Sequence, residues 1–265
     1  MSHPRPLAAA LSGMPDRTTP PSPSDEAGPL AGTPSAPPRP EEIRRAGPLL
    51  LLGFAGLVGC AFGLAVVVSA IRRSETSALD TLGNTFIHRF QSPVMDIVMN
   101  AATEIGRDLG LAAIATVGAI VLIRAKRDRE ALSIAVVLGG SILLNWAMKI
   151  FFHRARPVVP WAVAPADYSF PSGHSMNSMA LGLAIALVVW RLAGPRWGAV
   201  AFVAASLAAG VIGLSRVYLG VHYPTDVLGG YATAALWVGI VVGVFRVSAA
   251  WHWSPTERRK GRGAA

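Results

Sequence analysis

The sequence has few charged residues and almost no cysteine, and each shortage excludes a class of protein. Asp, Glu, Lys and Arg together make up 15% of the 265 residues, whereas a soluble domain carries about 25%. Cys60 is the only cysteine, so the chain can form neither an intramolecular disulfide nor a cysteine-based metal cage. Hydrophobic residues make up 52% of the chain. This composition favours a membrane protein over a soluble one.

Lysine is also scarce, so the positive charge comes almost entirely from arginine. The formal net charge is +9, and lysine occurs only at positions 126, 149 and 260. An arginine excess is typical of a high-GC bacterial genome and of the cytoplasmic flanks of membrane spans. We therefore expect no nucleic acid partner.

The first 46 residues lack an apolar run and hold eleven of the twenty prolines. Such a segment cannot bury enough apolar surface to offset the entropy lost on ordering. It also lacks the basic start and apolar core of a secretory signal peptide. We predict a disordered cytoplasmic tail at 1–46, a membrane domain at 47–250 and a basic cytoplasmic tail at 251–265.

Charge-free apolar runs dominate the middle of the chain. A membrane helix needs about 20 apolar residues to cross the hydrocarbon core of a bilayer. Glycines at 53, 56, 59 and 63 predict close helix packing in the first run. The runs predict an all-α fold, a polytopic membrane bundle of six transmembrane helices at 48–71, 109–123, 131–148, 175–190, 197–214 and 227–245.

The basic loops at 124–130, 191–196 and 258–262 set the expected orientation. Positively charged loops face the cytoplasm. The protein should therefore lie in the cell's inner membrane with both termini in the cytoplasm. The segments 72–108, 149–174 and 215–226 should then face outward. Within the first of them, apolar residues repeat at helical spacing over 92–106, which predicts a short interfacial or re-entrant helix.

The two later outer segments carry positive side chains on the side where the orientation rule disfavours them. Lys149 and Arg156 are seven residues apart and would share one helix face if the third span continued past the membrane. Pro157 disfavours helical geometry at Arg156, which marks the expected helix end. For His153 and Arg154, contact with lipid headgroups and a role in function remain equally open.

Two further stretches in these segments carry groups suited to phosphate chemistry. In "PSGH", Pro171 is placed to begin a helix whose free N–H groups at Ser172 and Gly173 would suit a phosphate. Near the last span, Asp226 follows His222 by four residues. Asp226 can accept the imidazole Nδ1–H and leave Nε2 as a nucleophilic lone pair.

Together these stretches resemble the signature of the type-2 phosphatidic acid phosphatase superfamily, which reads Lys-x6-Arg-Pro, Pro-Ser-Gly-His and Ser-Arg-x5-His-x3-Asp. The resemblance covers roughly residues 48–246, and no specified position departs from it. The eleven matching residues are Lys149, Arg156, Pro157, Pro171, Ser172, Gly173, His174, Ser215, Arg216, His222 and Asp226.

The resemblance implies a role for each polar residue of the signature. His222 would attack phosphorus and become a phosphohistidine, Asp226 would orient its ring, and His174 would act as general acid. The resemblance implies no metal and no other cofactor, because three cations would neutralise the phosphoryl charge. The expected phosphate ligands are Lys149, Arg156, Ser172, Gly173 and Arg216.

These observations predict an integral membrane phosphoric ester hydrolase with its active site facing outward. Its substrate would be a lipid phosphate in the bilayer, of the phosphatidate, phosphatidylglycerophosphate or polyprenyl diphosphate type, and its oligomeric state stays open. One alternative is a vanadate-dependent haloperoxidase, which shares the phosphate pocket but is soluble. Another is a non-catalytic lipid-binding or transport protein, which would not need His174, His222 and Asp226.

Overall fold

The computed structural model describes residues 40–73, 77–163 and 165–251. Positions 1–39 and 252–265, which hold most of the expected tails, lie outside the described residues, and the first helix begins at Pro40. The chain divides into two units between Leu49 and Leu50. The candidate site lies wholly in the second unit.

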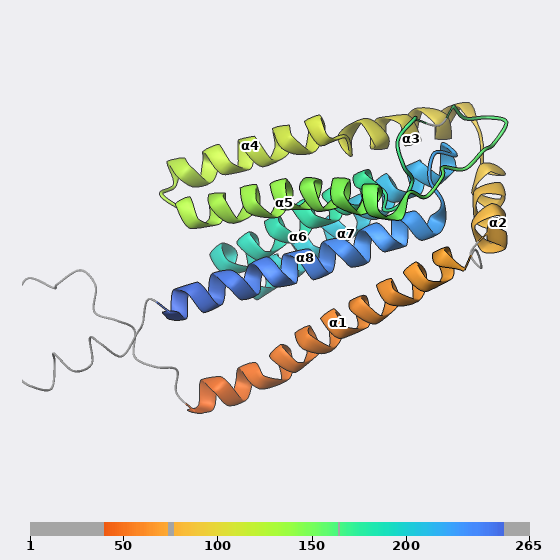
Figure 1. The fold of residues 1–265 in the computed structure, drawn as a ribbon. Helices are drawn as coiled ribbons and strands as arrows, with labels where there is room; N and C mark the ends of the chain where they lie inside the picture. Colours follow the sequence, from red (N-terminus) through yellow and green to blue (C-terminus); the bar gives the residue numbers. More distant parts are fainter. Residues whose placement is uncertain (1–39, 74–76, 164, 252–265) are drawn as a thin grey trace, which may run out of the picture. The chain divides into compact units, whose positions relative to one another are not determined.

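Helices and the segments that connect them account for the described residues, among which no strand occurs (Figure 1). This confirms the all-α prediction. The helices are α1 (Pro40–Arg72), α2 (Ser77–His88), α3 (Pro93–Ile105), α4 (Asp108–Arg124), α5 (Asp128–Phe152), α6 (Gly173–Ala193), α7 (Pro195–Tyr218) and α8 (Pro224–Trp251).

Five of these helices, α1, α5, α6, α7 and α8, are long and apolar enough to cross a membrane. The remaining predicted span, at 109–123, corresponds to α4, which has only 17 residues. Helices α3 and α4 pass the same test only as a pair, and they bend by 57° at a short break. The predicted count of six is therefore reached when this bent pair counts as one broken span.

Helix α6 is the central element of the second unit, because it packs against α4, α5, α7 and α8. Small residues permit this close approach: a Cβ added to Gly182 would lie 2.8 Å from the Cβ of Ala205 on α7. Asn177 of α6 accepts a hydrogen bond from Ser141 of α5 at 2.7 Å and donates one to Asp108 of α4 at 2.9 Å. These contacts fix the position of α6, the helix that begins within the "PSGH" motif.

The glycines of α1 do not pack as the sequence predicted. A Cβ added to Gly56, Gly59 or Gly63 would meet no neighbouring atom within 4 Å. None of the span from Phe54 to Arg72 is buried inside the protein. The prediction of close packing at these three glycines was wrong, because all three are exposed. The helix is partly covered elsewhere: Leu57 lies against α8, where a Cβ added to Gly239 would be 2.6 Å from its Cδ2.

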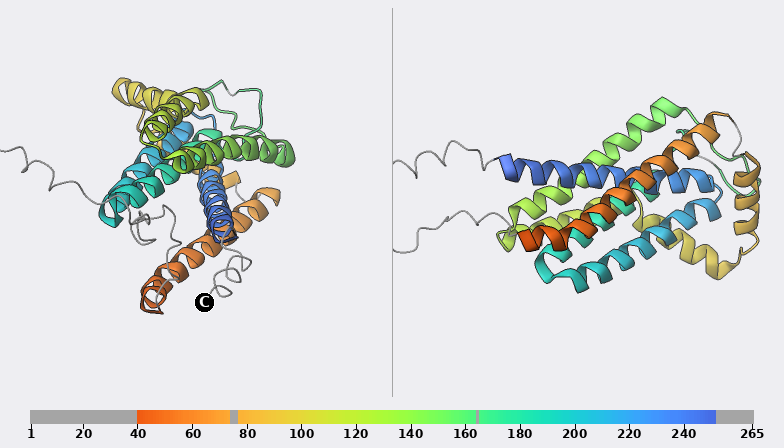
Figure 2. Two further views of the ribbon diagram at one scale, coloured as in Figure 1. Left: turned by 90° about the vertical axis from the view of Figure 1, so that its left-hand side faces the viewer. Right: turned by 90° about the horizontal axis from the view of Figure 1, so that it is seen from below.

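Helix α2, which the sequence analysis missed, runs across the ends of the long helices (Figures 1 and 2). Leu79, Leu82 and Phe86 on its outer face are 71%, 66% and 55% exposed, whereas Asp80 and Asn84 on its inner face are buried. The predicted helix within 92–106 is present as α3, and the Ser92 side chain caps it by accepting from the Met95 N–H at 3.2 Å. This end of the molecule also carries the α5–α6 connection and the α7–α8 turn.

Candidate active site

His222 occupies the turn between α7 and α8 and is almost completely buried. Its backbone N–H donates to the Arg216 carbonyl at 3.2 Å, which closes the turn over the end of α7. Gly220 adopts a φ of 67°, and a Cβ there would lie 2.6 Å from the Val159 side chain. Glycine is therefore required at this position, because both the conformation and the close neighbour disfavour a side chain.

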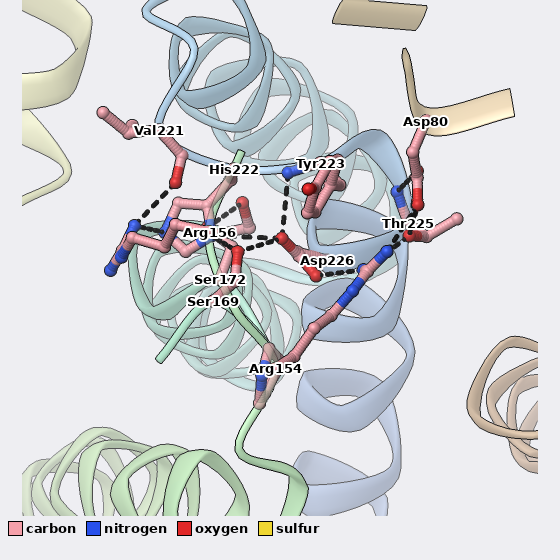
Figure 3. Close-up of polar contacts among 12 residues, drawn as sticks. Asp80, Arg154, Arg156, Ser169, Ser172, Val221, His222, Tyr223, Thr225 and Asp226 are labelled. Atoms are coloured by element: carbon pink, nitrogen blue, oxygen red, sulfur yellow. Dashed lines mark hydrogen bonds and ion pairs between the residues drawn. The ribbon is translucent and has the colours of Figure 1, made fainter. Parts of the chain in front are cut away.

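Asp226, in the first turn of α8, faces the ring of His222 as the sequence predicted (Figure 3). His222 Nδ1 lies 3.4 Å from Asp226 Oδ2, and the same oxygen accepts from the Ser169 hydroxyl at 2.5 Å and from the Tyr223 N–H at 2.9 Å. The aspartate is fully buried. The backbone and Ser169 thus hold the carboxylate beside the ring.

The second ring nitrogen of His222, Nε2, faces the guanidinium of Arg156. Arg156 Nη1 lies 3.0 Å from His222 Nε2. A guanidinium can only donate, so Nε2 accepts and carries the lone pair, which places the ring proton on Nδ1 toward Asp226. Burial, together with the charge of Arg156, lowers the pKa of His222 to about 4, although Asp226 opposes both. At neutral pH the ring is therefore uncharged and nucleophilic at Nε2.

Lys149 and Arg156 converge on one carboxylate, that of Asp167 in the α5–α6 connection. Lys149 Nζ forms an ion pair with Oδ2, and Arg156 Nη2 donates to Oδ1 at 2.7 Å. The expected helix end at Arg156 was wrong, so the condition under which the two cations would share a helix face is not met. Helix α5 ends at Phe152, where His153 caps it in the left-handed conformation, and Arg156 lies on the irregular segment that follows.

Asp167 was not singled out by the sequence analysis. Burial raises the pKa of its carboxyl, but the bonds and charges of Lys149 and Arg156 outweigh burial and hold the pKa below its usual range. Arg156 also donates from Nε to the Asp167 backbone carbonyl at 3.0 Å. The two motif cations therefore already bind an anion in this structure.

The start of α6 differs in one respect from the sequence prediction. The Ser172 N–H is not free for a phosphate, because it donates to the Asp226 carbonyl at 3.1 Å. This bond ties the "PSGH" segment to α8, which the sequence pattern alone did not reveal. Gly173 follows as the first residue of α6, and a Cβ there would lie 3.0 Å from Asn145 Oδ1.

His174 and Arg216 complete the set of motif side chains. Arg216, in the last turn of α7, donates from Nη1 to the Thr103 hydroxyl of α3 at 2.5 Å. His174 lies within electrostatic reach of both Arg216 and His222. Among the described residues, neither His174 Nε2 nor Arg216 Nε has a hydrogen-bond partner, although both atoms are buried. Two buried polar atoms without partners are the expected feature of a site built for a ligand.

Residues outside the motifs support the motif side chains, and the motifs predicted none of them. Thr103 supports Arg216, Ser169 supports Asp226, and Arg154 forms ion pairs with both Asp226 and Asp80. Only Arg154 gave a signal in the sequence, as an arginine on the disfavoured side. No group of three His, Cys, Asp or Glu side chains arranged to hold a metal ion occurs within the described part of the chain.

A helical membrane bundle that carries a buried histidine–aspartate pair beside several cations defines a class of enzyme, the membrane phosphoric ester hydrolases. Comparison with known proteins agrees. The model of the PAP2 superfamily matches residues 130–249. This chain belongs to the PAP2 superfamily.

Individual relatives give the same result. Phosphatidylglycerophosphatase B of Bacillus subtilis is 29% identical over 180 residues, which cover 67% of this chain and 89% of that protein. Decaprenylphosphoryl-5-phosphoribose phosphatase of Mycobacterium tuberculosis is 32% identical over 139 residues, which cover 51% of this chain and 70% of that protein.

A solved structure shares the fold. The crystal structure of a transmembrane PAP2-type phosphatidylglycerolphosphate phosphatase from Bacillus subtilis superposes with a TM-score of 0.67 at 28% identity, covering 72% of this chain and 96% of that one. This membrane fold argues against the soluble haloperoxidase alternative.

Proposed function

We propose that this protein is an integral membrane lipid phosphatase that hydrolyses a lipid phosphomonoester or diphosphate through a phosphohistidine at His222. The observation that carries the proposal is the anion already bound between Lys149 and Arg156, the Asp167 carboxylate. A substrate phosphate that takes its place would lie beside Arg156, whose Nη1 is 3.0 Å from His222 Nε2. The phosphorus would then be close to the nucleophile.

The reaction proceeds in two balanced steps. First, His222 Nε2 forms a bond to phosphorus while the bond to the lipid oxygen breaks, and the leaving oxygen takes a proton from His174. Second, a water oxygen attacks phosphorus, His174 accepts the water proton, and the P–N bond breaks to release phosphate. Lys149, Arg156 and Arg216 stabilise the charge on the phosphoryl oxygens, with Ser172 and Gly173 at the start of α6 beside them.

The relatives support a lipid substrate of one chemical type. Their names include a phosphatidylglycerophosphatase, an undecaprenyl-diphosphatase and a decaprenylphosphoryl-5-phosphoribose phosphatase. Each name describes a phosphate on a membrane lipid. The proposed partners of this chain are therefore a lipid phosphate and the surrounding bilayer.

The proposed function is tested by phosphate release from purified protein in detergent. The substrates are phosphatidate, phosphatidylglycerophosphate and undecaprenyl diphosphate. The wild type should release phosphate from at least one of them, and His222→Ala should lower kcat by about 10⁴-fold or more, as loss of a covalent nucleophile does. The exposed His153 is the matched control, and His153→Asn, which tolerates the left-handed conformation, should keep the wild-type rate. A non-catalytic binding protein would release no phosphate from any of the three.

We also propose that the active site faces the cell exterior or periplasm and that both termini are cytoplasmic. The basic loop at 124–130 supports this orientation, and the site lies at the opposite end of α5. With Cys60 replaced by serine, Val163→Cys should react with a membrane-impermeant maleimide in intact cells, since Val163 is 96% exposed. Asp128→Cys should react only after the membrane is opened. The reversed labelling would place the site in the cytoplasm.

A further inference from the structure

Asp226 belongs to a group of three largely buried charges, and the other two, Arg154 and Asp80, lie on the side of Asp226 that faces away from His222 (Figure 3). Arg154 Nη1 forms an ion pair with Asp226 Oδ1, and Arg154 Nη2 donates to Asp80 Oδ2 at 2.5 Å. The side chains of Asp226 and Asp80 are 0% and 1% exposed, and that of Arg154 is 12% exposed. One guanidinium thus joins two buried carboxylates.

Asp80 reaches this group from α2, more than 140 residues before Asp226 in the chain. Thr225 fixes the Asp80 carboxylate further, because its N–H donates to Oδ1 at 3.1 Å and its hydroxyl to Oδ2 at 2.8 Å. Arg154 also lies 4.4 Å from the centre of the Tyr223 ring. The three charges are therefore held by α2, by the segment after α5 and by α8 together.

The formal charges of Asp80, Arg154 and Asp226 sum to one negative charge. Without Asp80, the guanidinium would neutralise Asp226, and the pair would offer little attraction to a positive charge on the neighbouring ring. The proposed reaction creates that charge. When Nε2 bonds to phosphorus while Nδ1 keeps its proton, the imidazole becomes a cation, and the electron pair of the broken ester bond leaves with the lipid oxygen.

We propose that Asp80 is a positioning residue that neutralises Arg154, so that Arg154 can hold the Asp226 carboxylate in place while Asp226 keeps its negative charge for His222. This inference rests on the proposed function. It assigns a role to α2, whose outer face is apolar and exposed and whose inner face supplies the Asp80 carboxylate.

A purely structural role would make a different prediction from an electrostatic one. If Asp80 and Arg154 only supported packing, removing either would disturb His222 in the same way. The electrostatic role predicts opposite effects: Asp80→Asn removes a negative charge and lowers the pKa of His222, whereas Arg154→Gln removes a positive charge and raises it. The charged or titratable groups that face His222 are Asp226 of α8, Arg156 after α5, Arg216 of α7 and His174 of α6, and both variants keep all four.

The experiment titrates His222 by NMR on full-length protein labelled with ¹⁵N-histidine in detergent micelles, with His222→Gln to assign the signal. We expect the titration midpoint of His222 to shift by about 0.5 to 1 pH unit, to lower pH in Asp80→Asn and to higher pH in Arg154→Gln. The double variant Asp80→Asn/Arg154→Gln should return to within about 0.3 unit of the wild type. Asn84→Ala is the matched control, because Asn84 lies one turn along the same buried face of α2 and carries no charge, and it should leave the midpoint in place.

Shifts in the same direction, or no shift in either single variant, would overturn the inference. If a single variant does not fold, the double variant decides, and a midpoint more than about 0.3 unit from the wild type would contradict the proposal. A kinetic readout separates this inference from the proposed function. Asp80→Asn should lower kcat about tenfold and keep KM within twofold of the wild type. A wild type that releases no phosphate would refute the proposed function, and the NMR titration would then test the role of Asp80 by itself.

Discussion

Two groups of charged side chains flank His222, and they differ in how far solvent reaches them. In the first group, Lys149 and Arg156 bind Asp167, whose side chain is 52% exposed. In the second group, Arg154 binds Asp80 and Asp226, whose side chains are at most 1% exposed. In the proposed function a substrate phosphate replaces the exposed carboxylate, whereas the buried carboxylates are shielded from solvent.

This difference in exposure suggests a division of roles: the exposed group would bind the substrate phosphate, and the buried group would position His222. The exposed group presents cations to a replaceable anion, so changes there should act mainly on affinity for phosphate and on the charge that develops in the reaction. The buried group exposes little surface to a ligand, since the Arg154 side chain is 12% exposed and the two carboxylates at most 1%, and Asp226 connects it to His222. Changes there should act on the ring itself.

The largest effect among the following predictions is expected at His174, which belongs to neither group. His174→Ala should lower kcat for a lipid phosphate by about 10² to 10⁴-fold, because the poor leaving group then departs without a proton. The loss for p-nitrophenyl phosphate should be much smaller, since its leaving group hardly needs one. Parallel assays of both substrates make the measurement, and equal losses would remove the general-acid assignment.

A smaller loss is expected at Arg156 in the exposed group. Arg156→Ala should lower kcat/KM by about 10² to 10³-fold, because it removes the cation that faces His222 Nε2 and that is proposed to bind the phosphoryl oxygens. Arg156→Lys keeps the charge but loses the forked geometry, so it should recover only part of the activity. Steady-state kinetics on a lipid phosphate test this, and full recovery by lysine would mean that the geometry of Arg156 is irrelevant.

Substitution of Asp167 should modestly raise the affinity for phosphate and its analogues, which would sharpen the contrast between the two groups. Asp167→Asn removes the carboxylate that competes with phosphate, and a partly exposed ion pair is worth about 0.2 to 1 kcal/mol. The inhibition constant for vanadate and the KM for substrate should therefore fall by roughly 1.5- to 5-fold. Asp128→Asn, an exposed carboxylate at the start of α5, is the control. A rise in KM would instead show that Asp167 holds the two cations in place for the substrate.

The smallest effect is expected from removal of metal ions. With Lys149, Arg156 and Arg216 supplying positive charge at the phosphate, EDTA should leave kcat and KM unchanged. Phosphate release before and after dialysis against EDTA measures this. A strict requirement for added Mg²⁺ would contradict the proposed division of roles.

The residues of the sequence motifs could be predicted because each motif is short and has fixed spacing. The spacing of His222 and Asp226 correctly predicted a contact between their side chains, since four residues bring both to one side of a helix start. The apolar runs likewise predicted the long helices, because the length needed to cross a bilayer fixes how long such a run must be.

The supporting residues could not be predicted, because their contacts join distant parts of the chain. Asp80 lies in a short helix of mixed composition, and nothing near it in the sequence indicates that it meets Arg154 and Thr225. The segment from 153 to 172 has no periodicity, so the position of Asp167 between Lys149 and Arg156 depends on the tertiary fold. The bend between α3 and α4 also escaped prediction, since the sequence presents them as two separate segments.

The central claim is that His222 becomes covalently phosphorylated, and trapping the intermediate tests it most directly. Wild-type protein is mixed in detergent with a lipid substrate labelled with ³²P in its phosphate and quenched in alkali within milliseconds. The account predicts a label on the protein that is stable to alkali, labile to acid and absent from His222→Gln. Failure to trap any label during active turnover, or a label that persists in His222→Gln, would contradict the account.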